Sequence, residues 1–168
     1  MSLVRMNIHT IAVGGGVTPS MVVLCSQAAE GQEPIKLPIR IGMVEATAIS
    51  LGLDSSLHNR PMTHDLLQSV IESLRAQVVS VQIVDVMGTT FFAQLVLLDA
   101  EGRRLEVDCR PSDAIALAVR TGAPILADER VLEAATLPDF SGVERMEKEQ
   151  ELERFHDFVE SLSPEDFS

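Results

Sequence analysis

The chain has 168 residues, enough for one domain and an appendage, and it contains no run of about 18 uncharged apolar residues that would cross a membrane. Its formal net charge is −12 and basic residues nowhere cluster, so it lacks the positive patch typical of proteins that bind nucleic acid tightly. Trp and Tyr are absent, which also disfavours a stacking platform for single strands.

The first half of the chain is predicted to contain three strands and then two helices. Alternating apolar residues indicate strands at Asn7–Val13, Met21–Cys25 and Ile35–Ile41. Because proline has no N–H for a ladder, Pro38 is expected to lie at a sheet edge or a bulge. Helices are predicted at Gly42–Leu51 and Thr63–Ala76, the second capped by Thr63. One apolar stripe of this second helix consists of Leu67, Val70, Ile71 and Leu74.

The second half repeats this order. Strands are predicted at Val78–Val86, Phe91–Leu98 and Arg104–Cys109. The next helix begins at Pro111, whose fixed φ suits the first helical position, and ends before Gly122, which suits a left-handed residue. It has no polar face between Ala114 and Val119, so we expect it to be buried on nearly every side. The short segment Pro124–Leu126 and a helix at Asp128–Ala135, capped by Asp128, follow.

The two halves also match residue by residue. Seven positions between Leu37 and Ile49 recur 68 residues later, between Leu105 and Leu117, and in this register Glu45 corresponds to Asp113. The expected fold class is therefore α+β, with duplicated β3-α2 units that share one mixed sheet, followed by a helical tail.

The expected domain covers residues 6–138. Residues 139–168 are predicted to form an acidic amphipathic helical tail that packs on the body or on a second subunit. One face of this tail carries Leu152, Phe155, Val159 and Leu162. Residues 1–5 are interpreted as a cloning scar or a flexible N-terminus.

Cys25 and Cys109 lie in apolar segments that are predicted to be strands. Two cysteines in this setting are interpreted as buried small hydrophobic residues rather than as a disulfide or a metal pair. Together with the absence of a signal-peptide pattern, they favour a reducing cytoplasmic location without membrane association.

Three motifs in order resemble the signatures of the bifunctional nuclease (BFN) domain family. The first is LPIRIG at Leu37–Gly42 with EATAI at Glu45–Ile49, and the second is RPMTHDL at Arg60–Leu66. The third is RPSDAIALA at Arg110–Ala118 with GAPI at Gly122–Ile125. The resemblance spans about residues 6–137 and implies a single barrel-like β-sheet with helices packed outside it, usually in a homodimer. It also implies hydrolysis of both DNA and RNA.

Hydrolysis of a phosphodiester requires an activated water molecule, groups that stabilise negative charge, and a proton for the leaving oxygen. The motif residues that could supply these are, as catalytic candidates, His64, Asp65, Glu45 and Asp113, and, as phosphate-binding candidates, Arg60, Arg110 and Ser112. If the two halves of the repeat meet, Glu45 and Asp113 could hold Mg²⁺ or Mn²⁺ between them.

Each carboxylate candidate also has a structural explanation. Glu45 and Asp113 occupy the third position of equivalent helices, where an acid accepts backbone N–H groups and complements the helix dipole. Asp65 in the first turn of its helix has the same explanation. The sequence does not decide between a catalytic and a structural role for these three residues.

The remaining candidates also each have a functional and a structural interpretation. His64, near a helix N-terminus that disfavours its charged form, is either a general base or metal ligand or a hydrogen-bonding histidine. Arg60 and Arg110 each precede a proline at a helix entrance and could bind phosphate or clamp a carboxylate. Ser112 is interpreted mainly as a local hydrogen-bonding residue, because no His–Asp relay stands beside it in the sequence. The site is expected where the matching helix entrances meet.

The sequence supports two hypotheses about the function of the protein. The first is a cytoplasmic nuclease that hydrolyses DNA and RNA with low sequence specificity, a hypothesis that comes from the family resemblance. The alternative is a non-catalytic dimeric module that binds a small ligand or a protein partner and has a regulatory role.

Overall fold

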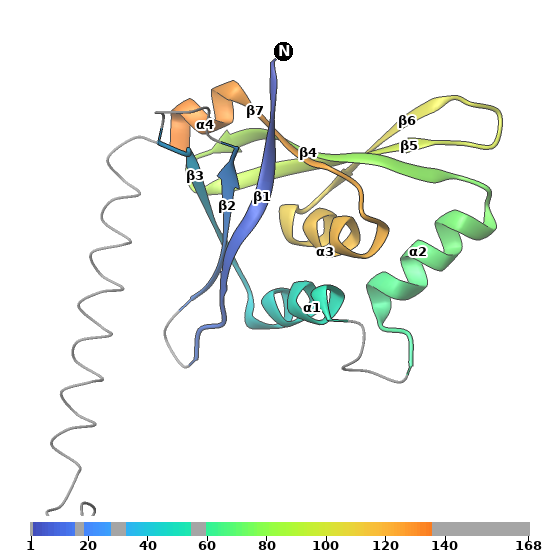
Figure 1. Ribbon diagram of the computed structural model, residues 1–168, viewed down its shortest axis with the longest axis horizontal. Coiled ribbons are helices and arrows are strands. Elements are labelled where there is room, and N and C mark those ends of the chain that lie inside the picture. The colour runs from blue at the N-terminus through green and yellow to red at the C-terminus, as the bar shows by residue number, and fades with distance from the viewer. Residues whose placement is uncertain (1, 16–18, 28–32, 55–59, 136–168) are drawn as a thin grey trace, which may run out of the picture. The chain divides into compact units, whose positions relative to one another are not determined.

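One mixed β-sheet of seven strands organises the chain (Figure 1). The computed structural model describes residues 2–15, 19–27, 33–54 and 60–135, so the predicted acidic tail lies outside the described residues. The strands are β1 (Leu3–Ala12), β2 (Ser20–Ser26), β3 (Lys36–Ile41), β4 (Gln77–Met87), β5 (Thr90–Leu98), β6 (Arg104–Cys109) and β7 (Ile125–Asp128). Their order in the sheet is β3-β2-β1-β7-β4-β5-β6.

The sheet is open, with β3 and β6 as its edges, and the expected barrel-like closure is not what the structure shows. Closure would require a ladder between these two edges. Pro38 lies within β3, paired with Val23 of β2, and it has no N–H to offer to a further strand. The prediction of an edge position for this proline is confirmed.

Two antiparallel meanders, β1-β2-β3 and β4-β5-β6, flank β7. β7 pairs antiparallel with β1 and parallel with β4, so it joins the two meanders into one sheet. Each meander leads into a helix, as a duplication would require. The halves then differ, because α2 follows the first helix whereas β7 and α4 follow the second. Duplication therefore stays a prediction.

The four helices are α1 (Met43–Leu53), α2 (Thr63–Ser73), α3 (Pro111–Thr121) and α4 (Glu129–Ala135). Helix α3 packs on β4 and β5 with one side and on α1 with another, so it lies between the sheet and α1 (Figure 1). Ala114 to Ala118 are all buried, which confirms the expectation from the absence of a polar face. Gly122 ends this helix with a φ of 71°, in the left-handed region that favours glycine.

Helices α1 and α3 approach closely at Gly52. A Cβ atom at this position would overlap Nη1 of Arg120 and Cγ2 of Val119. The absence of a side chain at residue 52 is therefore what leaves room for the Arg120 guanidinium between the two helices.

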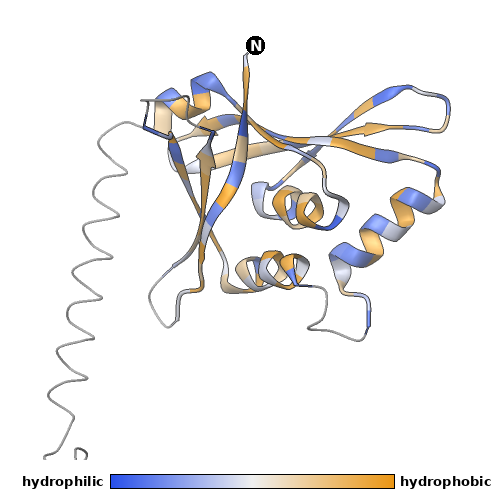
Figure 2. Ribbon diagram, viewed as in Figure 1, coloured by the Kyte–Doolittle hydropathy of each residue, from blue (hydrophilic) through white to orange (hydrophobic). Residues whose placement is uncertain are grey.

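Apolar and polar residues alternate along helix α2 (Figure 2), and most of its apolar stripe is exposed. Ile71 is buried against the body, but Leu67, Val70 and Leu74 are 38%, 46% and 70% exposed. The periodicity of the apolar residues correctly predicted an amphipathic helix. The rest of the domain covers only part of the apolar face of that helix.

Three local details differ from the sequence expectations. Residues 3–5, which the sequence interpretation set apart from the domain, belong to β1 and pair with β7. The residue that caps α2 is Met62 rather than Thr63. Cys25 and Cys109 are partly rather than fully buried, and both thiols are free. Within the described part of the chain, no helix is long and apolar enough to span a membrane.

Candidate functional site

Helices α1 and α3 begin beside the same pocket, which has a volume of about 360 Å³. Gly42 and Arg110 are their N-caps, and neither helix has a side-chain cap. First-turn N–H groups without a capping side chain, together with the helix dipole, favour a negative ligand at such a position. Glu45 and Ser112, from the first turns of these helices, line the pocket.

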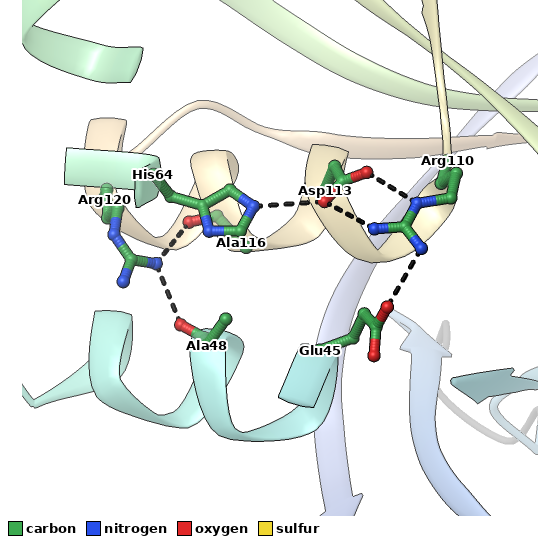
Figure 3. Close-up of polar contacts among 7 residues, drawn as sticks. All are labelled: Glu45, Ala48, His64, Arg110, Asp113, Ala116 and Arg120. Atoms are coloured by element: carbon green, nitrogen blue, oxygen red, sulfur yellow. Dashed lines mark hydrogen bonds and ion pairs between the residues drawn. The ribbon is translucent and has the colours of Figure 1, made fainter. Parts of the chain in front are cut away.

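Arg110 joins the two equivalent carboxylates (Figure 3). Its Nη1 donates to Oε1 of Glu45 at 2.9 Å. Its Nε and Nη2 donate to Oδ2 and Oδ1 of Asp113 at 2.8 and 3.2 Å, a bidentate arrangement. The side chain is nevertheless 64% exposed, so the guanidinium is oriented by two carboxylates while it remains open to solvent.

His64, at the start of α2, reaches Asp113 from the side opposite to Arg110 (Figure 3). Its Nε2 lies 3.2 Å from Oδ1 of Asp113, and its side chain is 15% exposed. His64 therefore contacts a residue that holds Arg110, but it does not itself line the pocket.

The contacts between Asp113 and Arg110 favour the charged form of each side chain. Burial alone would raise the pKa of Asp113, but the hydrogen bonds and charges of Arg110 and His64 outweigh it and hold that pKa below its ordinary value. Hydrogen bonds to Asp113 and Glu45 raise the pKa of Arg110 further, so the guanidinium stays protonated.

Cys109 lies directly before Arg110 but is not an activated nucleophile. Burial first, and then the carboxylates of Asp108 and Asp113, raise the pKa of its thiol to about 11. A thiol with this pKa is protonated at neutral pH, and it is the thiolate that attacks.

The lowered pKa of Asp113 predicts a pH-dependent contribution to stability. Because the unfolded state binds the proton more readily, the stabilisation is present above the ordinary carboxyl pKa of about 3.9 and is lost as the pH falls through the lower folded value. Asp113→Asn should therefore lower the free energy of unfolding at pH 7, and the difference from wild type should shrink below about pH 4. Urea unfolding at pH 7 and pH 3 measures it, and an equal difference at both values would contradict this account.

Sequence reasoning missed three residues that line the pocket. Arg40 comes from β3, Thr89 comes from the turn between β4 and β5, and Thr90 is the first residue of β5. Arg40 lies in the first motif, but an arginine within an alternating strand resembles any solvent-facing residue. Its alignment with the entrances of α1 and α3 depends on the packing of the sheet.

Four predicted site residues do not line this pocket. Asp113 and His64 are connected with it through Arg110, whereas Asp65 and Arg60 lie apart. Asp65 accepts the Met62 N–H at 2.7 Å, which completes a capping box, and binds Nε of Arg120 at 2.6 Å, so its contacts are structural. Arg60 is exposed, and no polar contact within the described residues connects it with Arg110, Glu45 or Asp113.

Arg120 holds three helices together, a role that no local pattern in the sequence predicts. Its side chain is 3% exposed and pairs with Asp65 of α2. Its Nη1 donates to the Ala48 carbonyl of α1 at 3.0 Å and to the Ala116 carbonyl of α3 at 2.8 Å (Figure 3). This contact fixes α2, and with it His64, relative to α3.

The donor set does not fit a resident Mg²⁺ or Mn²⁺ ion. Such ions take several oxygen ligands, and no group of three or more His, Cys, Asp or Glu side chains among the described residues is placed to hold one. Arg110 donates to both Glu45 and Asp113, so a guanidinium already links the carboxylates that a metal would bridge.

A sequence model of the bifunctional nuclease domain family matches residues 23–139 of this chain. Two proteins of Mycobacterium tuberculosis, from strains CDC 1551 / Oshkosh and ATCC 25618 / H37Rv, are each 42% identical to it over 135 residues. Each alignment covers 78% of this chain and 80% of the relative, and each relative is named only as an uncharacterized protein.

Proposed function

Because this chain belongs to the bifunctional nuclease domain family, we propose that it hydrolyses phosphodiester bonds of DNA and RNA, with low sequence specificity, in the pocket at the start of α1 and α3. The observation that supports this most strongly is the exposed guanidinium of Arg110, held by Glu45 and Asp113 at that pocket. A planar guanidinium in a fixed orientation matches the oxygens of a phosphate.

In the proposed reaction, Arg110, Arg40 and the first-turn N–H groups of α1 bind the non-bridging phosphate oxygens and stabilise the charge that develops on them. The carboxylate of Glu45 takes a proton from a water molecule, whose oxygen forms the new bond to phosphorus. The bond from phosphorus to the leaving sugar oxygen breaks, and solvent supplies the proton for that oxygen.

His64 is proposed as a positioning residue, which revises its role as a catalytic candidate. It contacts Asp113 rather than the pocket, and Asp113 orients Arg110. In this scheme Asp113 likewise acts through Arg110, and Asp65 acts on the start of α2 through its cap and Arg120.

The purified protein tests this proposal on single- and double-stranded DNA and RNA, with Mg²⁺, Mn²⁺ or EDTA present. Glu45→Gln should lower kcat by about 10²-fold, because it removes the proton acceptor. The matched control is Glu106→Gln, whose carboxylate is exposed on β6 and should leave kcat unchanged. Equal rates for wild type and Glu45→Gln would identify a contaminating nuclease and refute the proposed site. The metal-assisted route stays a prediction that the EDTA samples test.

The surface of α2 supports a second expectation from the sequence, a homodimer. Leu66, Leu67, Val70 and Leu74 are large apolar side chains that are all at least 38% exposed on one helix. Contiguous exposed apolar surface of this kind is typical of an interaction site. We propose that a second copy of the chain covers it, and if the nuclease assay fails, a non-catalytic dimeric module is the function that remains.

Charge placed on this surface should separate the dimer. Leu74 is 70% exposed, so Leu74→Glu should leave the fold intact while it introduces a charge into a desolvated contact. Sedimentation should show a dimer for wild type and a monomer for Leu74→Glu. Val44→Glu, on the 75% exposed Val44 of α1, should remain dimeric as a control. A monomeric wild type would refute the dimer.

A further inference from the structure

The pocket at the start of α1 and α3 is small and carries its positive charge in few groups. Its volume of about 360 Å³ lies near the lower end of the usual range for ligand pockets, about 300–1,000 Å³. Two arginines, Arg40 and Arg110, are among the residues that line it. The hydroxyl-bearing residues Thr89 and Thr90 stand at the turn beside them. A space of this size takes one nucleotide with its phosphate.

The rest of the described surface offers little to hold a long strand. Apart from Arg40 and Arg110, the described residues include eight Lys or Arg. Four of them pair with carboxylates away from the pocket: Arg103, Arg104, Arg120 and Arg130. The other four are spread over β1, β3 and the two ends of α2: Arg5, Lys36, Arg60 and Arg75. The chain as a whole has a net charge of −12, which repels a polyanion. Proteins that follow a strand instead combine a positive groove with several aromatic stacking residues.

Part of the pocket wall is apolar. Ile39, Ile41, Phe91 and Pro111 line it beside the two arginines. Such walls exclude water from a sugar and a base without reading the edge of the base. The pocket lining contains no Asn or Gln amide, the side-chain type that pairs with adenine.

We infer that the substrate class is a short phosphodiester, of dinucleotide size, bound through the Arg40 and Arg110 contacts alone. This inference rests on the proposed function and narrows it. In this inference a strand longer than two nucleotides makes no further contact with the protein. The affinity per phosphodiester bond therefore does not increase with the length of the strand. Arg40 acts in it as a substrate-binding residue.

The inference predicts how strongly the binding affinity depends on salt concentration. Each neutralised phosphate of a single strand contributes about −0.7 to the slope of log affinity against log salt. One phosphate, held by both arginines, gives a slope of about −0.7, which is a loss of about 2.6-fold between 50 and 200 mM salt. A strand held at six or more phosphates would lose more than about 10²-fold over the same range.

The test measures binding of a 5′-phosphorylated thymidine dinucleotide and of a long oligothymidylate to the full chain by calorimetry, at both salt concentrations. We expect the two affinities to agree within the statistical factor for the number of equivalent bonds, with the same salt effect of about 2.6-fold for each. Arg40→Ala should weaken dinucleotide binding about tenfold, whereas Arg104→Ala, on exposed Arg104 of β6, should not change it.

The outcomes separate the inference from the proposed function. Dinucleotide binding that needs Arg40, without cleavage of any substrate, would support the inference about the ligand and refute the hydrolysis. Cleavage of the long strand, with a steep salt effect and much weaker dinucleotide binding, would support the nuclease and overturn the inference. Dinucleotide binding that is absent, or is unchanged in Arg40→Ala, would also overturn it.

Discussion

Replacing Arg110 by alanine should lower kcat for phosphodiester hydrolysis by about 10³-fold. Arg110 is the group proposed to meet the charge on the phosphate, and loss of one such preorganised donor typically costs about 10²–10³-fold. We expect the upper value because the same guanidinium also orients Glu45, through Nη1, and Asp113, through Nε and Nη2. Without it, Glu45 loses its guanidinium partner at the pocket, and Asp113 keeps its contact with His64.

Steady-state rates of protein purified in parallel measure this effect. Arg104→Ala is the matched control, since Arg104 is an exposed arginine that pairs with Glu106 on β6. Arg110→Lys should recover only part of the activity, because an ammonium group cannot reproduce the bidentate contact with Asp113. Wild-type activity in Arg110→Ala, with the fold intact, would place the chemistry elsewhere.

Replacing Arg120 by methionine should destabilise the fold by about 3 kcal/mol. The change leaves Asp65 without its buried partner and removes the donor to two helix carbonyls, those of Ala48 and Ala116. Breaking a buried ion pair on one side typically costs about 3–5 kcal/mol. We expect the lower value because Nη2 of Arg120 has no partner among the described residues and Asp65 keeps its bond to the Met62 N–H.

Urea unfolding gives the free energy for this comparison. Arg104→Met serves as the control and should change it by less than about 1 kcal/mol, as is usual for an exposed ion pair. Asp65→Asn with and without Arg120→Met completes a double-mutant cycle, in which we expect a coupling of at least about 1 kcal/mol. A cost below about 1 kcal/mol for Arg120→Met would show that the three helices do not depend on this residue.

Much of the fold follows from local signals in the sequence. β6 has the predicted bounds, and the other five predicted strands differ by a few residues at their ends, because alternation of apolar side chains reports directly on a pleated surface. The seventh strand, β7, was not predicted, since its four residues are too few to show an alternation. Pro111 and Gly122 marked the two ends of α3, since each has a backbone requirement of its own.

The convergence of the helix entrances could also be anticipated from the matched spacing. The structure brings Glu45, Arg110 and Asp113 together, and His64 joins them through Asp113. Of the alternatives for Arg110, a clamp on a carboxylate is the contact present, and it spans both halves of the chain. Whether it also binds phosphate stays a prediction.

Other features depend on packing that no local signal encodes. The partner of Arg120 lies 55 residues away, so the buried pair emerges only when α2 docks on α3. Arg40 is read as a solvent-facing strand residue until the sheet places it beside the first turns of α1 and α3. The apolar stripe of α2 is exposed because the rest of the domain does not cover it, and the two edges of the sheet are open because no further strand pairs with them. The periodicity of apolar residues does not report on either.

The most direct measurement is a crystal structure of the protein with a phosphorothioate dinucleotide, which resists cleavage. The account predicts that the phosphorothioate lies in the pocket at the start of α1 and α3, within hydrogen-bonding distance of the Arg110 guanidinium, with Arg40 on its other side and Glu45 facing the phosphorus. A dinucleotide bound on another surface, with Arg110 in contact only with Glu45 and Asp113, would contradict it.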